Sequence, residues 1–252
     1  MVGMFERSLD RLSSVSLEEI SGEASLMRRY DHKYATTDVR ANDFIATLND
    51  DWRVLRIGRE PSPLYRTTYF DDDRFRTYRD HVQGRRPRFK IRSRTYQNGA
   101  SFLEVKMKTG RGQTDKRRIA RPDDAPHHLS EPELDWLHAL LPDFDPRSLR
   151  PTLKVESRRI TLHSSTLAER VTIDHSMRVT NGEEWTPLLD GGVVVETKSE
   201  TFRSRAFHLL ADLDVRPVSF SKYCAGLSVV DASVHPRIRI DAERALHVGV
   251  GE

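Results

Sequence analysis

Apolar and polar residues alternate with a period of two along most of the chain, and clusters of Gly, Pro, Asn or Asp interrupt the alternation. Because successive side chains of a strand point to opposite faces of a sheet, this pattern predicts β-strands. The Asn98-Gly99 pair between two of them is a strong hairpin signal. The predicted strands span residues 28–36, 64–70, 86–96, 101–108, 115–120, 151–163, 168–175 and 193–199.

Three segments show the helical spacing of apolar residues instead. The first helix runs from a cap at Thr37 or Asp38 to about Leu48. Residues 130–133 begin a second helix, because their Ser and Glu have the spacing of a capping box. A third helix is predicted over residues 201–213. We therefore expect a mainly β protein of the α+β class with peripheral helices.

One face of the strand at residues 88–96 is a row of cations, because its even-numbered positions are Lys or Arg as far as Arg94. The strand at 101–108 repeats the arrangement with Lys106 and Lys108. A sheet with one dry and one solvated face would explain any single strand of this kind. On these adjacent strands, however, cations outnumber acids. A barrel whose apolar side packs outward and whose lumen carries the cations explains the set better.

The composition is that of a polar but globular protein. The 252 residues are 37% hydrophobic and 31% charged, and the mean hydropathy is −0.62. Because apolar runs do not exceed three residues, neither a membrane span nor a secretory signal is expected. A single cysteine, Cys224, cannot form an internal disulfide. We therefore expect a cytoplasmic protein.

Charge is concentrated in one part of the chain. Residues 85–118 carry a net charge of +10, which leaves −7 for the remainder, so an anionic partner is expected. The acids Glu104, Asp174 and Glu196 are few and isolated among the Lys and Arg of these charged faces, an arrangement that suits a divalent cation bridging carboxylate and phosphate. Only Tyr96 interleaves with the basic row, so phosphate without bases fits better than nucleic acid.

Several segments, taken in their order along the chain, resemble the VTC domain. This domain is the polyphosphate polymerase branch of the triphosphate tunnel metalloenzymes, a superfamily that also includes the CYTH phosphatases. The similarity extends from about Tyr30 to Leu227. The segments are RRYDHKYATT, YFDD at 69–72, KIRSRTY, FLEVKMK, KRR at 116–118, VESRRI, RVTIDHSMR, VVETKSE and SFSKYCAGL.

The resemblance implies a closed eight-stranded antiparallel β tunnel, with helices outside it and a C-terminal capping segment. It divides the chain into a helical lead-in at 1–27, a tunnel domain at 28–228 and a tail at 229–252. The family usually has an aromatic residue where Ser157 stands in this chain.

Site residues follow from the resemblance together with the predicted faces. The expected catalytic residues are Arg92, Arg94, Lys106, Lys116, Arg159 and Lys222. The expected substrate-binding residues are Lys33, Lys90, Lys108, Arg118, Arg170, Lys198 and Ser221. The expected ligands of a divalent metal, Mn²⁺ or Mg²⁺, are Glu196 and Glu104.

The leading hypothesis is a metal-dependent phosphotransferase that moves the γ-phosphoryl group of ATP to a growing inorganic polyphosphate chain inside the tunnel. One alternative is a metal-dependent triphosphatase that hydrolyses inorganic triphosphate, short polyphosphate or nucleoside triphosphate. Another is a non-catalytic module that binds polyphosphate or RNA through residues 85–118. The expected partners are ATP or another triphosphate and polyphosphate, with no specific nucleic acid.

Overall fold

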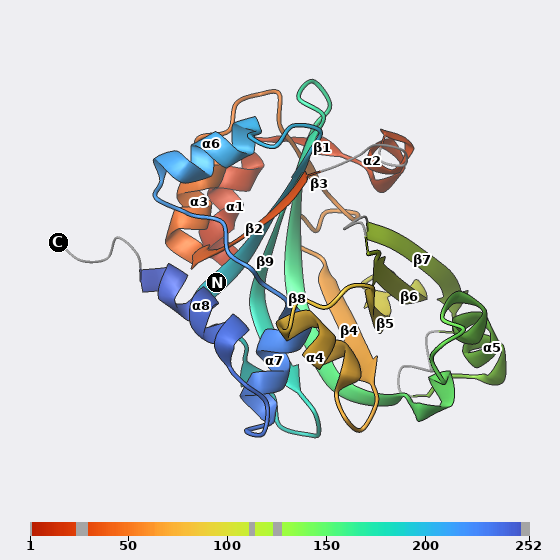
Figure 1. Cartoon of the computed structure of the whole chain (residues 1–252). Helices are drawn as coiled ribbons and strands as arrows, with labels where there is room; N and C mark the ends of the chain where they lie inside the picture. The colour runs from red at the N-terminus through yellow and green to blue at the C-terminus, as the bar shows by residue number, and fades with distance from the viewer. Residues whose placement is uncertain (1, 24–29, 111–113, 123–127, 248–252) are drawn as a thin grey trace.

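A single sheet organises the chain in the computed structural model, which describes residues 2–23, 30–110, 114–122 and 128–247 (Figure 1). Its eight long strands follow one another in the order β2-β11-β9-β8-β4-β5-β6-β7, and all of these neighbours are antiparallel. Short strands extend the sheet: β1 pairs in parallel with β3, β3 pairs with β8, and β10 pairs with β9.

The elements have the following bounds. The long strands are β2 (Tyr30–Thr37), β4 (Leu64–Asp71), β5 (Arg88–Tyr96), β6 (Ser101–Lys108), β7 (Thr114–Arg121), β8 (Arg150–Ser164), β9 (Glu169–Thr180) and β11 (Gly192–Ser199). The short strands are β1 (Ser13–Val15), β3 (Arg53–Leu55) and β10 (Thr186–Pro187). The helices are α1 (Val2–Asp10), α2 (Leu17–Glu23), α3 (Asp38–Ala46), α4 (Arg76–Val82), α5 (Glu131–Leu140), the 3-10 turn η1 (Pro146–Ser148), α6 (Arg205–Asp212), α7 (Lys222–Val230) and α8 (Arg237–His247).

All eight predicted strands are present as the long strands, and the three predicted helices are α3, α5 and α6. Residues 28 and 29 of the first predicted strand lie outside the described residues. The predicted hairpin joins β5 to β6, with Gly99 at a φ of 84°. The capping box of α5 forms between Ser130 and Glu133 as expected. Strand β9 ends five residues later than predicted, at Thr180.

The outer face of the sheet is apolar and covered by helices. Strands β8, β9 and β11 belong to one buried cluster with α1, α3 and α6, in which Phe44 and Leu210 are fully buried. Ile91 of β5 and Val105 of β6 share a second cluster with Leu137 of α5. Burying such a side chain contributes roughly 1.5–3 kcal/mol, so this packing fixes which face of each strand points outward. The cations at the alternate positions therefore point inward, as predicted.

A β-bulge in β9 divides the inner face into two zones. Ser176 has a φ of 48°, and the register between β8 and β9 shifts beside it. Such a bulge inserts one residue into a strand, so positions beyond it change face relative to those before it. As a result Asp174 lies among the charges of the inner face, whereas Met177 and Val179 are buried in an apolar zone on the same side.

Helices α7 and α8 cover this apolar zone at one end of the sheet (Figure 1). A Cβ on Gly226 of α7 would lie 2.8 Å from Leu153 and 3.0 Å from Val179, so the helix packs closely on β8 and β9. Helix α8 falls in the segment predicted as a tail; it contacts β2 and buries Ile238 and Leu246. The described part of that segment is therefore part of the folded body.

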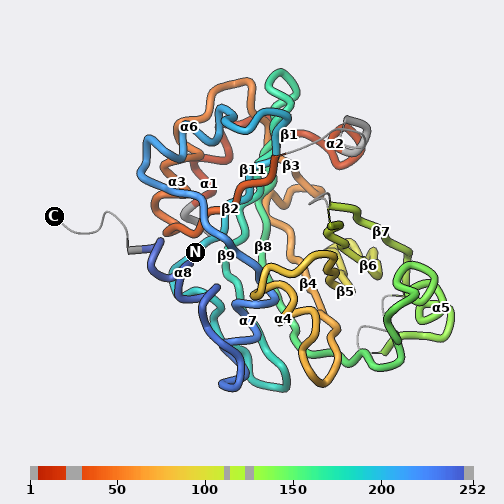
Figure 2. The backbone as a smooth tube through the Cα atoms, in the orientation of Figure 1, coloured from red at the N-terminus to blue at the C-terminus, as the bar shows by residue number. Residues whose placement is uncertain are grey.

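The two edge strands, β2 and β7, come from opposite ends of the strand order, and the described residues contain no hydrogen-bonded pairing between them. The sheet nevertheless bends far enough for Lys106 of β6 to interact electrostatically with Lys33 and Glu196 of the opposite wall. The connection from α6 to α7 runs beside β2, where the Val218 amide donates to the Lys33 carbonyl over 2.7 Å (Figure 2). This connection delivers the start of α7 to the inner face.

The close packing of α7 predicts the effect of a larger residue at its contact point. Gly226→Val should lower the free energy of unfolding by about 1–3 kcal/mol, because the added methyl groups would overlap Leu153 and Val179. Urea unfolding followed by circular dichroism measures the change. The matched control is Gly182→Val, where nothing lies within 4 Å of the new Cβ and little change is expected. Equal effects of the two substitutions would contradict the packing of α7.

Candidate functional site

The charged zone of the inner face brings together residues from seven strands and one helix. All of the site residues expected from the sequence lie in the described part of the chain. Lys33 is on β2; Lys90, Arg92 and Arg94 on β5; Glu104, Lys106 and Lys108 on β6; Lys116 and Arg118 on β7; Arg159 on β8; Arg170 on β9; Glu196 and Lys198 on β11; and Ser221 and Lys222 at the start of α7.

Glu104 is the acidic centre of the β5-β6-β7 wall. Its side chain is 1% exposed; Arg92 Nε donates a hydrogen bond to Oε2 at 2.7 Å, and Lys116 Nζ forms an ion pair with Oε1 at 2.6 Å. Burial favours the neutral acid, but Arg92, Arg94 and Lys116 outweigh it and hold the pKa of Glu104 well below its usual range. Glu104 is therefore an anion that positions two cations.

Asp174 performs the same role on the opposite wall. Arg159 donates to both carboxylate oxygens through Nε and Nη2 at 2.8 Å each, and Lys222 Nζ lies 2.9 Å from Oδ2. The side chain is 3% exposed. Burial opposes ionisation here too, but Arg159 and Lys222 hold the pKa of Asp174 far below normal. The sequence analysis had marked this acid only among the isolated carboxylates that suit a divalent cation, and not as the partner of Arg159 and Lys222.

Glu196 is the third carboxylate of the zone. It pairs with Lys33 of the neighbouring strand β2 and with Lys198, which is 3.2 Å away. Burial would raise its pKa, but Lys198 and Lys33 lower it well below the usual value. With 15% of its side chain exposed, Glu196 is the most accessible of the three acids.

Arg94 lacks a comparable partner. It is 9% exposed, forms no ion pair with any described residue, and its Nε has no hydrogen-bond acceptor. Burial lowers the pKa of Arg94 and the adjacent Arg92 lowers it further, while Glu104, which forms no ion pair with Arg94, offsets only part of this. Burial likewise lowers the pKa values of Lys90 and Lys222 to about 8. These groups would be stabilised by an incoming anion.

Hydrogen bonds to Asp71, the last residue of β4, hold the start of α7 in place. The buried Asp71 carboxylate accepts the Tyr223 hydroxyl at 2.7 Å, the Thr77 hydroxyl at 2.8 Å and the Thr77 and Tyr78 amides of α4. Next to Tyr223, Lys222 reaches Ser157 Oγ at 3.1 Å, and Lys90 donates to Ser221 Oγ at 2.7 Å. The Asp71–Asp73 cluster therefore begins with a structural carboxylate.

Two aromatic residues of the zone were not expected. Tyr65 of β4 lies directly opposite Ser157 in register, and the Arg159 guanidinium is 5.1 Å from its ring centre. An aromatic ring missing from β8 at Ser157 is thus supplied by the next strand. Phe102 of β6 lies opposite Arg94, and Arg118 lies over its ring at 4.6 Å. Such cross-strand pairs depend on register, which the local sequence pattern does not reveal.

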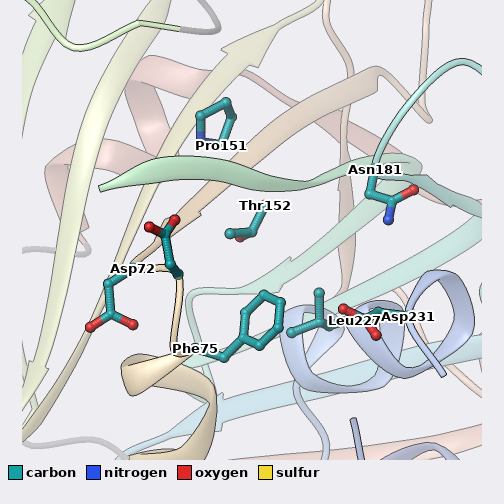
Figure 3. A pocket seen from close by; sticks show the side chains of 8 residues that line it. Asp72, Phe75, Pro151, Thr152, Asn181, Leu227 and Asp231 are labelled. Carbon is teal, nitrogen blue, oxygen red and sulfur yellow. The ribbon is translucent and has the colours of Figure 1, made fainter. Parts of the chain in front are cut away.

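A pocket of about 320 Å³ lies elsewhere, between the turn after β4, the start of β8 and the end of α7 (Figure 3). Its lining includes Asp72, Asp73 and Asp231, so it would repel a phosphate chain. It is not part of the charged zone.

No helix in the described residues is long and apolar enough to cross a membrane.

The described residues contain no group of three or more His, Cys, Asp or Glu side chains that could hold a metal ion by itself. The charged zone offers isolated carboxylates instead. Mg²⁺ in phosphate-handling sites is commonly bound by one or two carboxylates plus oxygens of the substrate. The residues present therefore fit a divalent ion that is completed by a bound phosphate.

Comparison with known proteins agrees with this architecture. The family model of the VTC domain matches residues 28–231, and the chain belongs to the VTC domain family. A proposed adenylate cyclase from Bacillus halodurans is 13% identical with a TM-score of 0.50, over 77% of this chain and 94% of that one. A proposed adenylyl cyclase from Hippeastrum with a dominant triphosphatase activity is 12% identical with a TM-score of 0.44, over 82% and 100% of the two chains. No curated protein matches. The predicted tunnel fold is thereby confirmed.

The ion pairs of Asp174 predict a large loss of stability when its charge is removed. Asp174→Asn should lower the free energy of unfolding by about 3–5 kcal/mol at pH 7, because Arg159 and Lys222 would keep their charges without a full acceptor. Urea unfolding measures the loss. The control, Asp214→Asn, removes an exposed pair with Arg216 and should change little.

The same variant should alter the acid limb of the stability profile. A carboxylate whose pKa is lower in the folded than in the unfolded state adds stability that is fully present above its unfolded pKa, about 4, and lost as the pH falls toward the folded value. The wild-type protein should therefore lose stability below about pH 4, and Asp174→Asn should lose less over that interval. An identical acid slope in both proteins would argue against the depressed pKa of Asp174.

Proposed function

We propose that the charged zone transfers the γ-phosphoryl group of ATP to the end of an inorganic polyphosphate chain. The observation that carries the proposal is Arg94, a buried guanidinium without an ion-pair partner among the described residues, in a zone where Glu104, Asp174 and Glu196 already hold two cations each. A buried cation in this situation calls for an external anion. Several cations in a row suit a chain of phosphates.

The reaction requires little covalent chemistry of the protein. A terminal oxyanion of polyphosphate attacks the γ-phosphorus of ATP; the new P–O bond forms as the bond between that phosphorus and the β,γ-bridging oxygen breaks, and ADP leaves with the electron pair. The attacking group is already an anion, so no side chain has to remove a proton from it. Arg92, Arg94 and Arg159 would hold the phosphates in line and offset the charge that develops between them.

The fixed geometry of these arginines supports this role. Arg92 and Arg159 are each tied to a carboxylate that is almost completely buried, so their guanidinium groups are oriented before substrate binds. Lys222, at the first turn of α7, joins them through Asp174. The positive end of the helix dipole points the same way and favours an anion there.

Glu196 is the residue we assign to the divalent metal, Mn²⁺ or Mg²⁺, because it is the most accessible carboxylate of the zone. A bound ion would supply Lewis-acid stabilisation of phosphate oxygens. Glu104, the other ligand expected from the sequence, would have to release Arg92 or Lys116 before binding an ion. Lys33 and Lys198 would then turn from Glu196 toward phosphate.

Hydrolysis of triphosphate is the second candidate. In the described residues no hydrogen-bond ladder joins the edge strands β2 and β7. Lys106, on the strand next to β7, is exposed to solvent. Water that reaches the γ-phosphate could replace the polyphosphate terminus as acceptor. A module that only binds polyphosphate or RNA is the third candidate, and turnover distinguishes it from both enzymes.

Product analysis separates these candidates. Incubation with ATP and Mn²⁺ should yield ADP and acid-labile phosphate polymer, and Arg94→Gln should reduce the rate at least 100-fold, since one fixed donor to a transition state contributes about 2.7–4 kcal/mol. Arg66→Gln is the matched control, because Arg66 is exposed and pairs with Glu156 away from the charged zone. Free phosphate without polymer would favour the hydrolase, and binding without turnover would favour the binding module.

The metal assignment predicts a separate effect. Glu196→Gln should raise the Mn²⁺ concentration needed for half-maximal activity by at least tenfold, while binding of tripolyphosphate without metal weakens less than twofold or improves. Titration of Mn²⁺ in activity assays and calorimetry of tripolyphosphate in a chelating buffer measure the two effects. Asp214→Asn provides a carboxylate control on the surface. An unchanged Mn²⁺ requirement would show that Glu196 is not the ligand.

A further inference from the structure

An aromatic cluster lies at one end of the charged zone, on three adjacent strands. Tyr65 of β4 is paired in register with Tyr96 of β5, and their ring centres are 5.1 Å apart in an edge-to-face arrangement. Phe102 of β6 continues the row, with its ring centre 6.0 Å from that of Tyr96. All three side chains are only partly buried. The cluster therefore presents ring surface at the end of a wall that is otherwise charged.

The rings are interleaved with the cations of the zone. Arg94 is 5.7 Å from the Tyr65 ring centre, and it precedes Tyr96 by two residues on the same face of β5. Arg159 stacks on Tyr65, and Arg118 stacks on Phe102. A ligand that touches the aromatic cluster would consequently have its next groups beside Arg94 and Arg159.

A phosphate chain alone gives no reason for this cluster. The face of an aromatic ring carries negative electrostatic potential, so it repels anions and attracts cations or flat electron-poor rings. A nucleobase is a flat ring attached to a triphosphate, and proteins that bind bases without reading their sequence stack them on half-exposed aromatic side chains. Arginine planes contribute to the same kind of stacking.

We infer that Tyr65, Tyr96 and Phe102 form a stacking site for the base of a nucleoside triphosphate whose phosphates occupy the charged zone. The inference rests on the proposed function and adds the direction in which the nucleotide lies along β5. With the base at Tyr96, the triphosphate runs along β5 past Arg94 toward Arg92. The acceptor chain then approaches from the Lys90 end, where α7 begins.

The sequence suggested phosphate without bases because Tyr96 alone interleaves with the basic row. The strand register adds Tyr65 and Phe102 from the two neighbours of β5, which the sequence alone did not place beside Tyr96. Stacking of this kind recognises the flat ring and not its edge. Purine nucleotides with different edge groups should therefore bind with similar affinity.

Calorimetry with two ligands tests the inference in the full chain. The β,γ-imido analogue of ATP carries a base, and inorganic tripolyphosphate does not. Tyr96→Ala should weaken binding of the ATP analogue by roughly 5- to 100-fold, the cost of losing a base–aromatic stack, and should change tripolyphosphate binding by less than twofold. Phe102→Leu should act in the same direction and preserves apolar volume if the alanine variant folds poorly.

Two controls define the reference. Tyr96→Phe keeps the ring and should retain the wild-type preference for the ATP analogue. Tyr30→Ala removes an exposed aromatic residue of β2 that packs on Phe202 outside the zone, and it should change neither affinity. In saturation-transfer NMR the adenine protons should receive magnetisation from wild-type protein and lose it in Tyr96→Ala.

If Tyr96→Ala lost affinity equally for the ATP analogue and for tripolyphosphate, the stacking site would be overturned. The rings would then act only by positioning Arg94. Unchanged affinities in Tyr96→Ala and Phe102→Leu would overturn it as well. In both cases wild-type protein that binds tripolyphosphate leaves the proposed function intact. Wild-type protein that binds neither ligand would instead refute the proposed function, and the stacking site with it.

Discussion

The charged zone depends on keeping cations ionised where little water reaches them. Glu104, Asp174 and Glu196 meet this requirement for six cations, two for each carboxylate. The remaining buried guanidinium, Arg94, has no such partner in the described part of the chain. An anion that binds the folded protein and not the unfolded chain would therefore also stabilise the fold. Affinity for such an anion and conformational stability would then depend on the same side chains.

The bulge at Ser176 allows one sheet face to serve two purposes. On one side of it the inner face is charged, and on the other side it is apolar and packs against α7 and α8. Helix α7 spans the division: Gly226 rests on the apolar zone, and Lys222 reaches Asp174 in the charged zone. The position of Lys222 is thus determined by apolar packing several residues further along the helix.

Local sequence pattern was sufficient for the strands and for the side on which each cation lies, because a strict period of two can be read from neighbouring residues alone. It was sufficient for the hairpin at Asn98-Gly99 for the same reason. The pairing of Asp174 with Lys222 could not be read this way, since 48 residues separate the two and only the path of α7 brings them together. Likewise Tyr65 and Phe102 join Tyr96 through strand register. The bulge at Ser176 is not marked by a glycine, so β9 was predicted too short.

Asp71 makes the position of Lys222 sensitive to changes outside the charged zone. Its carboxylate joins the first turn of α4 to Tyr223, and the next residue toward the N-terminus is Lys222. Adjacent Cα atoms are about 3.8 Å apart, so a displacement of Tyr223 would also shift the backbone that carries Lys222. Damage to the turn at residues 72–75 would consequently disturb the charged zone, although every residue of that zone remained chemically intact.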